Sequence, residues 1–406
     1  MHIAHFTNTY KPNLNGVARS VSTFRGALAR MGHQVFVFAQ EARDYEDDEP
    51  FIFRYPGFDI PYFDYSFTLP VSPHIDWVFP YLKVDVIHSN HPVLLGKVAA
   101  DKAEKYNLPL VFTFHSRYTE YGHYLPLNQS FWRRIIVESL ANYIPQCQHV
   151  VTPNESIRQS LREYGGVTEG VTTIPTGIEL EPYQTANGDA IRQKYGVEGK
   201  RLLVSIGRLA LEKNWKTLIA AFSEVIRSAD DVLLMLIGDG LQRGDLEDYA
   251  KSLGVYQQII FTGQIPFEEV PDYLQAGNLF CFASVAETQG LVSMEALAAG
   301  LPVVAVNAAG TRDTVDDGIQ GLLTENDCHA LAQAILQVLA DEALLRRFQA
   351  EALQKAAVFD IKVQAEKLLS VYEQAIEDKA AGRSVVVDRD LLKDTRDQLG
   401  LSLASS

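Results

Sequence analysis

The chain has 406 residues, of which 47% are hydrophobic and 21% are charged, and its formal net charge is -15. A single hydrophobic core stops growing near about 250–300 residues, so this length predicts two domains. The negative charge argues against a broad nucleic-acid-binding surface, which would require a basic stripe, and against simple electrostatic binding to anionic lipid.

Three further features bear on the compartment. The longest apolar runs, such as LLVSI and VLLMLI, are much shorter than the roughly 20 residues that span a bilayer, so we expect no transmembrane helix. The N-terminus MHIAHFTNTY has no secretory-signal pattern, and three isolated cysteines indicate neither a disulfide framework nor a zinc site. These features predict a cytoplasmic protein and leave open a peripheral contact with the inner face of a membrane.

The first half of the chain alternates short apolar runs with helical patterns. The predicted strands are HIAHF, QVFVFA, VDVIHS, PLVFTF and HVVTP, and the predicted helices cover about 17–31, 93–106 and 131–144. Apolar runs that alternate with helices are typical of a parallel sheet covered by helices. We therefore predict an N-terminal Rossmann-like domain over 1–177.

The second half repeats this scheme with RLLVSIG, VLLMLIG, QIIFTG, LFCFAS and PVVAV as strands. Pro, Gly and Thr cluster at 172–183, where we place the hinge, so the second domain covers 178–360. A last helix over 361–379 is predicted to cross back to the N-terminal domain, and the tail 380–406 is too charged and aperiodic to join a core. Two doubly wound domains predict a ligand cleft at the carboxyl ends of both sheets.

Two cations follow the first strand of the second half, in SIGRLALEKNWKTLI. Arg208 and Lys213 suit a diphosphate, because arginine offers a bidentate fork and lysine a point charge. The alternative is a solvated charged loop. In LIGDGLQRGDL, Gly238 and Gly240 flank Asp239 after another strand, which indicates a tight turn more than a nucleotide-binding loop, because the full GxGxxG spacing is missing.

The stretch AETQGLVSMEALAAG carries two acids, Glu287 in a strand-end loop and Glu295 in the following helix. Eight residues at about 1.5 Å each separate them by roughly 10 Å, which fits neither a metal-sharing pair nor two carboxylates flanking one glycosidic bond. The spacing suits the two ends of a nucleotide sugar, with the diphosphate at the helix N-terminus. The alternative is a helix-entry acid and an unrelated surface glutamate.

The segments SIGRLALEKN, ETQGLVSMEALAAGLPVVA and VVTPNESIRQSL…TTIPTGIEL together resemble the retaining glycosyltransferases of family 4, over residues 1 to about 379. The resemblance implies the GT-B fold, in which two Rossmann-like domains face each other across a cleft, and a reaction without a metal or other cofactor. It implies that Arg208 and Lys213 hold the donor diphosphate, that Glu287 contacts the transferred sugar and that Glu295 contacts the ribose. The same resemblance implies phosphate contacts from the backbone of Gly290, Leu291 and Val292.

In the N-terminal half, the resemblance implies that a glycine loop and a strand-end histidine lie near the donor, which match Gly16 in KPNLNGV and His115 in VFTFHSRYTEYGHY. On position alone, a lone strand-end histidine such as His115 is more often a structural residue. The family's double glycine is Asn15-Gly16 here, and Asp313 stands where the family has a glutamate. His88 and His91 have a spacing that a metal could use, but no third ligand is evident nearby, so we predict no metal site.

The resemblance implies a front-face reaction, in which the departing diphosphate helps to deprotonate the acceptor hydroxyl. ETQGL and the histidine stretch look most like the diacylglycerol glycosyltransferases and the phosphatidylinositol mannosyltransferases. The aromatic segment 51–81 is compatible with an acceptor pocket or a membrane contact. The helix 128–144, with Phe131, Trp132, Arg133 and Arg134, is equally explained as an interfacial helix or as a core-facing helix.

We therefore predict a transferase that moves a hexose from a nucleotide sugar such as UDP-glucose to a membrane lipid such as diacylglycerol. A transferase to a soluble sugar or small alcohol, and a nucleotide-sugar epimerase or binding protein on the same scaffold, stay open. The residues do not distinguish the donor base, the sugar or the oligomeric state.

Overall fold

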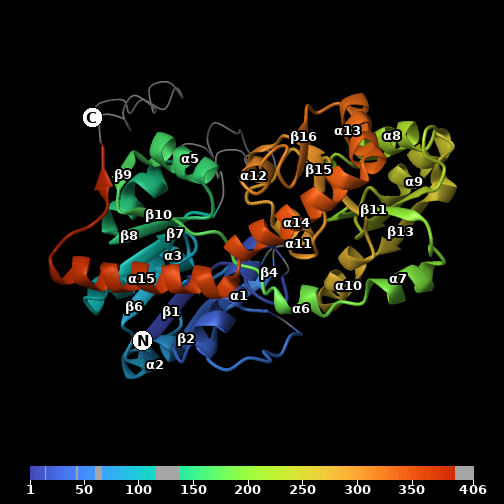
Figure 1. The fold of residues 1–406 in the computed structure, drawn as a ribbon. Coiled ribbons are helices and arrows are strands. Elements are labelled where there is room, and N and C mark those ends of the chain that lie inside the picture. The colour runs from blue at the N-terminus through green and yellow to red at the C-terminus, as the bar shows by residue number, and fades with distance from the viewer. Residues whose placement is uncertain (14, 43, 60–65, 116–136, 389–406) are drawn as a thin grey trace, which may run out of the picture. The chain divides into compact units, whose positions relative to one another are not determined.

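The computed structural model describes residues 1–13, 15–42, 44–59, 66–115 and 137–388 (Figure 1). The chain divides into two compact units. One unit comprises Met1–Gly177 together with the chain from Ile361 onward, and the other comprises Ile178–Asp360.

The first unit is built on a seven-stranded, all-parallel sheet with the order β10-β8-β7-β6-β1-β2-β3. Its strands are β1 (His2–Thr7), β2 (Gln34–Gln40), β3 (Ile52–Tyr55), β6 (Val86–Ser89), β7 (Leu110–Thr113), β8 (His149–Thr152) and β10 (Val171–Thr173). Its main helices are α1 (Gly16–Arg30), α2 (Pro73–Val78), α3 (Leu95–Lys105), α5 (Glu155–Gly165) and α15 (Ile361–Ala380). A separate antiparallel pair is formed by β4 (Gly57–Asp59) and β5 (Ser66–Thr68).

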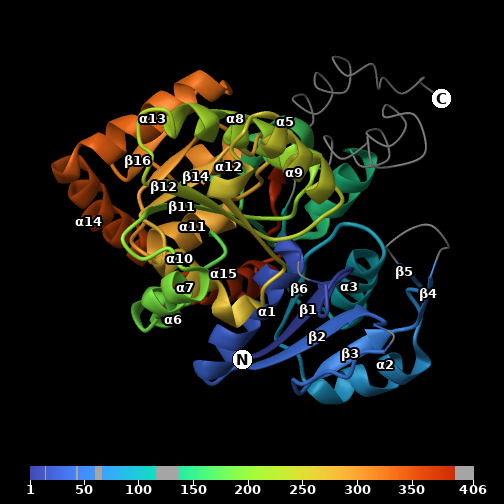
Figure 2. The ribbon, with the colours of Figure 1, turned by 90° about the vertical axis from the view of Figure 1, so that its right-hand side faces the viewer.

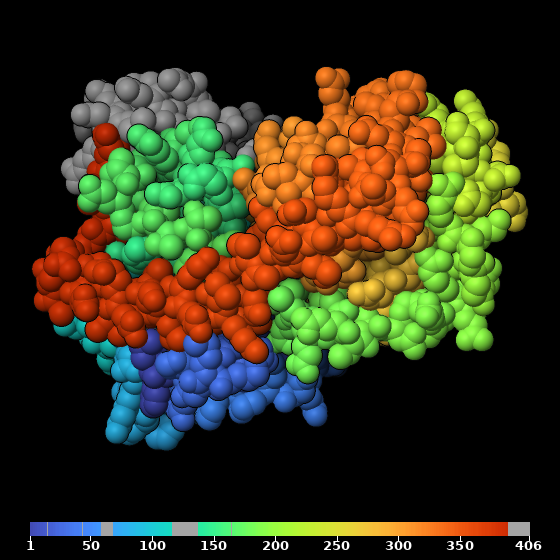
Figure 3. Space-filling model, in the orientation of Figure 1, coloured from blue at the N-terminus to red at the C-terminus, as the bar shows by residue number. Residues whose placement is uncertain are grey.

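Both faces of this sheet are buried, as expected for parallel strands. In β1, Phe6 joins an aromatic cluster on one face, and Ile3 packs on the other face against α1 and α15. Helix α15 contributes Leu368 and Tyr372 to that second core and lies against α1 (Figure 3). The last long helix of the chain is therefore part of the N-terminal unit.

The second unit has a six-stranded, all-parallel sheet with the order β13-β12-β11-β14-β15-β16 (Figure 2). Its strands are β11 (Arg201–Ile206), β12 (Val232–Ile237), β13 (Ile259–Gly263), β14 (Leu279–Phe282), β15 (Val303–Val306) and β16 (Gly321–Thr324). Its helices are α6 (Glu181–Gln184), α7 (Gly188–Tyr195), α8 (Trp215–Val225), α9 (Arg243–Ser252), α10 (Val270–Gln275), α11 (Leu291–Ala298), α12 (Ala309–Arg312), α13 (Cys328–Ala340) and α14 (Glu342–Val358). Neighbouring residues Leu203 and Val204 of β11 are buried in opposite cores.

The two parallel sheets confirm the predicted α/β class. In each sheet the strand order reverses next to the first strand of the unit. This topological switch point lies between β1 and β6 in the first unit and between β11 and β14 in the second. Ligands of open α/β sheets bind outside the carboxyl ends of the strands at such points. The loops after these four strands are therefore the places to look for a functional site.

One expectation about the tail was wrong. We expected no part of 380–406 to join a core, but Val385 is 5% exposed and packs in the first unit, and β17 (Val386–Val387) pairs with β9 (Val167–Glu169). The backbone N–H of Val385 donates to the carbonyl of Cys147 at 2.9 Å. Val386 and Val387 form a short strand despite the charged residues around them, because β-branched side chains suit a half-buried edge.

Within the described ranges, no single helix is long and apolar enough to cross a bilayer. The consecutive helices α13 and α14 meet the requirements of length and composition only as a pair, which is bent by 99°.

Candidate functional site

The switch point of the second unit carries the two predicted cations. The chain leaves β11 through Gly207, and Arg208 follows with 70% of its side chain exposed. Lys213 ends a short 3-10 turn, Leu211–Lys213, directly before α8. The indole N–H of Trp215 donates to the carbonyl of Arg208 at 3.0 Å and thereby ties this loop to the buried start of α8.

Glu287 lies in the loop after β14, and the structure brings it into direct contact with Lys213. The Lys213 Nζ donates to Glu287 Oε1 at 2.5 Å, and the Ser284 hydroxyl donates to the same oxygen at 2.8 Å. The side chains of Lys213 and Glu287 are 20% and 10% exposed. Residues 74 positions apart in the sequence therefore form one ion pair at the switch point, where solvent screens it only weakly.

Arg208 has a different partner from Lys213. Its Nη2 donates to Glu212 Oε1 at 2.7 Å. Burial acts to raise the pKa of Glu212, but its backbone hydrogen bond and the neighbouring Arg208 and Lys213 outweigh burial, so that the pKa is lowered. Two cations and two carboxylates thus lie at the neighbouring ends of β11 and β14, and an anion that binds the cations competes with these carboxylates.

Two glycines allow the loop of Glu287 to pack closely. A Cβ added to Gly310 would lie 2.7 Å from the carbonyl oxygen of Glu287 and 2.8 Å from its Cβ. Gly290 has a φ of +72°, and a Cβ there would lie 2.8 Å from the carbonyl oxygen of Gly310. The Gly310 N–H also donates to the Glu287 carbonyl at 3.1 Å. Gly290 and Gly310 therefore allow the close packing that holds the Glu287 loop in place.

Helix α11 begins next to this loop, with Gly290 as its N-cap. Its first hydrogen bonds are donated by the N–H groups of Ser293 and Met294 to the Gly290 carbonyl, so the N–H groups of Leu291 and Val292 precede the helical ladder. N–H groups in this position form an anion-binding helix end. The predicted backbone contacts of Gly290, Leu291 and Val292 are thus geometrically available.

Glu295 is in a different environment from Glu287. It lies in the middle of α11 between the buried residues Met294 and Ala296, and it is 1% exposed. In this conformation its side chain is almost inaccessible to solvent. The sequence placed Glu295 in the helix but gave no sign of its burial.

The LIGDG segment forms a tight turn. The Leu209 N–H donates to the Asp239 carbonyl at 2.9 Å, and a Cβ added to Gly240 would lie 2.5 Å from the Leu209 carbonyl oxygen. This turn packs against the loop of Arg208, which favours the structural interpretation of its glycines.

In the first unit, Gly16 is the first residue of α1 and is exposed. The Asn15 side chain accepts a hydrogen bond from the Ala18 N–H at 2.9 Å and caps the helix. It also donates to Thr9 Oγ1 at 2.7 Å. Asparagine in place of a glycine therefore has a structural reason here, because an asparagine N-cap satisfies a helix N–H that a glycine leaves open.

His115 follows β7, and it is 7% exposed. Its Nε2 lies 2.9 Å from the amide oxygen of Asn90, which follows the neighbouring strand β6. Burial, together with the charged forms of His91 and His5, lowers the pKa of His115 to about 3. His115 is therefore a neutral ring at physiological pH.

The pair His88 and His91 does not form a shared site. His88 Nδ1 lies 2.7 Å from the Tyr372 hydroxyl of α15, and His88 Nε2 lies 2.6 Å from Thr113 Oγ1. His91 Nδ1 instead accepts the N–H of Asn8 at 3.1 Å. Among the described residues, no group of three or more His, Cys, Asp or Glu side chains is arranged to hold a metal ion.

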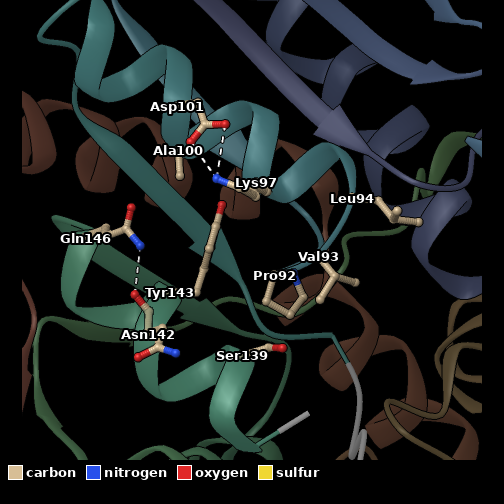
Figure 4. Close-up of a pocket in the computed structure, with 10 residues that line it drawn as sticks. All are labelled: Pro92, Val93, Leu94, Lys97, Ala100, Asp101, Ser139, Asn142, Tyr143 and Gln146. Atoms are coloured by element: carbon tan, nitrogen blue, oxygen red, sulfur yellow. Dashed lines mark hydrogen bonds and ion pairs between the residues drawn. The ribbon is translucent and has the colours of Figure 1, made fainter. Parts of the chain in front are cut away.

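A pocket of about 350 Å³ lies beside α3 in the first unit (Figure 4). Pro92, Val93 and Leu94, which follow the switch-point strand β6, contribute apolar surface to it. Lys97 and Asp101 form an ion pair at 3.0 Å along the same helix. Pockets of this size that combine apolar walls with a few polar groups are typical of small-ligand sites. The remaining lining residues are Ala100, Ser139, Asn142, Tyr143 and Gln146.

The aromatic segment that we expected near the acceptor is described at 51–59 and 66–81. Trp77 and Tyr81 are 66% and 71% exposed, and their rings lie 5.7 Å apart between centroids. The opposite side of the same short helical stretch is buried through Ile75 and Phe79. Phe131, Trp132, Arg133 and Arg134 lie outside the described residues.

Sequence reasoning missed two supporting residues, Ser284 and Asn90. Ser284 stands three positions before Glu287 in the same strand-end loop, and this short spacing was the available signal. Asn90 stands in HSNHP, where the flanking histidines drew attention to metal binding and away from the amide.

Comparison with known proteins gives two family matches. Residues 187–355 match the family described as glycosyl transferases group 1, and residues 14–182 match glycosyltransferase family 4. The two matches cover most of both units.

Individual relatives support these matches. The chain is 32% identical to an alpha-monoglucosyldiacylglycerol synthase of Streptococcus pneumoniae, over 84% of this chain and 78% of the relative. It is 29% identical to an alpha-monoglucosyldiacylglycerol synthase of Acholeplasma laidlawii, over 79% of this chain and 84% of the relative. Among solved structures, Anabaena HepE in complex with UDP and glucose has a TM-score of 0.73 at 20% identity, over 92% of this chain and 99% of that chain. Sucrose-phosphate synthase from Thermosynechococcus elongatus has a TM-score of 0.75 at 22% identity, over 93% of this chain and 99% of that chain.

Proposed function

Because this chain belongs to the family 4 glycosyltransferases with the GT-B fold, we propose that it is a retaining hexosyltransferase that moves glucose from UDP-glucose to the free hydroxyl of diacylglycerol. The observation that carries the proposal is the contact of Lys213 with Glu287 at the switch point of the second unit, beside the N-terminus of α11. A cation for phosphate and an acid for sugar hydroxyls lie there side by side.

In the proposed donor complex, the diphosphate lies against Lys213, Arg208 and the first N–H groups of α11. These groups neutralise the negative charge that develops on the phosphate as the glycosidic bond breaks. Glu287 accepts hydrogen bonds from hydroxyls of the transferred sugar, and Glu295 contacts the ribose. Because the diphosphate competes with Glu287 for Lys213, donor binding frees the acid for the sugar.

We propose that no metal takes part in the reaction. The two cations and the helix N-terminus supply the positive charge that a divalent ion supplies in other nucleotide-sugar enzymes. The departing diphosphate oxygen accepts the proton of the acceptor hydroxyl, while this hydroxyl attacks the anomeric carbon from the same face. His115, in the first unit, is proposed to contact a substrate hydroxyl.

The acceptor is proposed from three observations. Two relatives that align over most of the chain are named for synthesis of an alpha-monoglucosyldiacylglycerol. The first unit holds a partly apolar pocket after β6, which suits the apolar part of a lipid. Its exposed Trp77 and Tyr81 are side chains that favour a membrane interface, because their rings are apolar and their edges polar. The product for which these relatives are named is an alpha-glucoside, and the glucose of UDP-glucose is also alpha-linked. Transfer from this donor to that product therefore retains the anomeric configuration.

The donor is tested with the purified full chain and a panel that includes UDP-glucose, UDP-galactose and GDP-mannose. We expect UDP-glucose to be hydrolysed slowly alone and to be consumed rapidly when vesicles containing diacylglycerol are added. A preference for GDP-mannose would overturn the donor assignment. Sugar inversion without any acceptor would favour the epimerase alternative.

The membrane contact is tested by sedimentation with neutral and anionic vesicles. We expect the Trp77→Ser/Tyr81→Ser variant to bind more weakly, whereas Phe267→Ser, which removes a 50% exposed ring from the second unit, binds as the wild type does. If the wild-type chain stays in the supernatant and transfers glucose to a soluble alcohol at full rate, the lipid acceptor is wrong. The pocket after β6 is then the place to seek a soluble acceptor.

A further inference from the structure

Three adjacent strand ends meet at Asn90 in the first unit. Its backbone N–H donates to the Phe6 carbonyl of β1 at 2.9 Å, and its side-chain Nδ2 donates to the same oxygen at 3.2 Å. Its Oδ1 lies 2.9 Å from His115 Nε2, beyond the end of β7. Asn90 is 2% exposed, so these contacts are made away from solvent.

The contact with Phe6 settles the orientation of the Asn90 amide. A carbonyl oxygen only accepts hydrogen bonds, so the group that faces Phe6 must be the NH₂. The group that faces His115 is then the amide oxygen, which also only accepts. The hydrogen between Asn90 and His115 therefore belongs to the histidine Nε2.

This assignment fixes the chemistry of the whole imidazole ring. A neutral histidine carries one hydrogen, and when that hydrogen is on Nε2, the Nδ1 has a lone pair and accepts hydrogen bonds. Burial lowers the pKa of His115 to about 3, and His91 and His5 act in the same direction, so the ring stays neutral. His115 then offers an acceptor for a hydroxyl group and no positive charge.

We propose that Asn90 is a positioning residue that holds His115 in the Nε2–H tautomer, so that Nδ1 accepts a hydrogen bond from a substrate hydroxyl. This inference rests on the proposed hexosyl transfer, because it adds a partner to the histidine of that site. The hydroxyl belongs either to the transferred sugar or to the acceptor alcohol, and both present the same donor to Nδ1.

A purely structural role for Asn90 has different consequences. If Asn90 only connected the ends of β1 and β6, its replacement would lower stability without changing which nitrogen of His115 carries hydrogen. A positioning role requires that the tautomer and the kinetics change together. The tests below separate these two outcomes.

The first test needs no variant of Asn90. Nitrogen NMR of the full chain with ¹⁵N-labelled histidine reports which ring nitrogen of each histidine is protonated, and the spectrum of His115→Gln identifies the His115 signals. We expect the Nε2–H form at neutral pH. A His115 ring that is protonated on Nδ1 overturns the proposal, whatever the variants do.

The second test compares Asn90→Leu with Asn90→Asp. Leucine removes the acceptor for Nε2–H, so we expect kcat to fall by about tenfold to a hundredfold, since small misplacements of a contacting group cost this much. Aspartate keeps an oxygen opposite Nε2 and loses only the side-chain hydrogen bond to the Phe6 carbonyl, whereas leucine loses both contacts, so we expect aspartate to retain more activity. Its negative charge also raises the pKa of His115 by about 1–3 units, which moves the acid limb of the pH profile to higher pH than in the wild type.

Controls make each outcome informative. Gln159→Leu replaces an exposed amide of the same unit and should leave kcat and the pH profile unchanged. Equal activity of Asn90→Leu and wild type, or identical acid limbs in Asn90→Asp and wild type, would overturn the proposal. Melting curves show whether Asn90→Leu folds. If it does not, the NMR result and the pH profile of Asn90→Asp decide whether the proposal holds.

The same variants identify the hydroxyl. If Nδ1 contacts the transferred sugar, Asn90→Leu slows donor hydrolysis in the absence of acceptor as well as transfer. If it contacts the acceptor, only transfer slows. A wild-type chain that transfers no sugar would refute the proposed function, while the NMR spectrum would still show the tautomer of His115.

Discussion

Replacement of Lys213 by alanine separates two contributions of this side chain, one to the stability of the fold and one to turnover. The side chains of Lys213 and Glu287 are 20% and 10% exposed, and Glu287 keeps the hydrogen bond from Ser284 when the lysine is lost. Removal of one partner from a fully buried pair costs about 3–5 kcal/mol, and loss of a hydrogen bond to a charged group costs about 1.5–3 kcal/mol. We expect about 2 kcal/mol here, because one hydrogen bond and some solvent contact remain.

The loss of turnover should be larger than this loss of stability suggests. Lys213 is proposed to stabilise charge on the leaving diphosphate, and removal of one such group costs about 3 kcal/mol in the barrier, or about a hundredfold in rate. For a unit of this size, 2 kcal/mol corresponds to a melting temperature lower by about 4–8 °C. The Lys213→Ala protein should therefore be folded and almost inactive at 25 °C.

The double variant Lys213→Ala/Glu287→Gln tests this explanation. It removes the carboxylate that the single change leaves without its cation, so about 1 kcal/mol of stability should return while turnover stays low. Lys216→Ala is the matched control, because it removes an exposed cation of α8 and should change neither quantity. Calorimetry and UDP-glucose turnover measure both quantities. A folded Lys213→Ala variant with near-normal turnover, or a double variant with restored turnover, would refute the role in catalysis.

Four further predictions follow from the same site. Arg208→Ala should lower turnover by about a hundredfold with little change in melting temperature, because its side chain is 70% exposed; a large drop in melting temperature would contradict this. Glu287→Gln should chiefly lower kcat and Glu295→Gln should chiefly raise KM for the donor, since Glu287 is proposed to contact the reacting sugar and Glu295 the unchanging ribose. The reverse pattern in steady-state kinetics would mean that the donor binds in the opposite direction. Gly310→Ala should lower both stability and turnover, because the new Cβ lies 2.7 Å from the Glu287 carbonyl oxygen, and a variant that melts and turns over like the wild type would show that the loop adapts. EDTA should leave the rate unchanged, whereas inactivation that Mn²⁺ reverses would show that a metal is required.

The fold class was accessible from the sequence because parallel strands that are buried on both faces appear as short apolar runs. RLLVSIG and VLLMLIG became β11 and β12, as predicted. The sixth strand of the second unit, β16, was not predicted, since GLLT is short and follows a polar turn. The strand β17 of the tail was not predicted either, because its two valines stand among charged residues.

The candidate site was only partly accessible. Local patterns placed Lys213 and Glu287 at strand ends, but the order of strands in the sheet decides that the two strand ends are neighbours, and no local pattern carries that order. The burial of Glu295 could not be predicted from the sequence either, because it depends on how α11 packs between the sheet and the neighbouring helices. The roles assigned to these residues are still predictions.

The anomeric configuration of the lipid product tests the central claim most directly. The purified chain is incubated with UDP-glucose and vesicles containing diacylglycerol, and the proton NMR spectrum of the extracted lipid shows the configuration at the new glycosidic bond. We predict an alpha-linked glucosyl diacylglycerol, formed in the presence of EDTA. A beta-linked product would contradict retention, and the absence of a glucolipid under conditions in which UDP-glucose is transferred to a soluble alcohol would contradict the lipid acceptor.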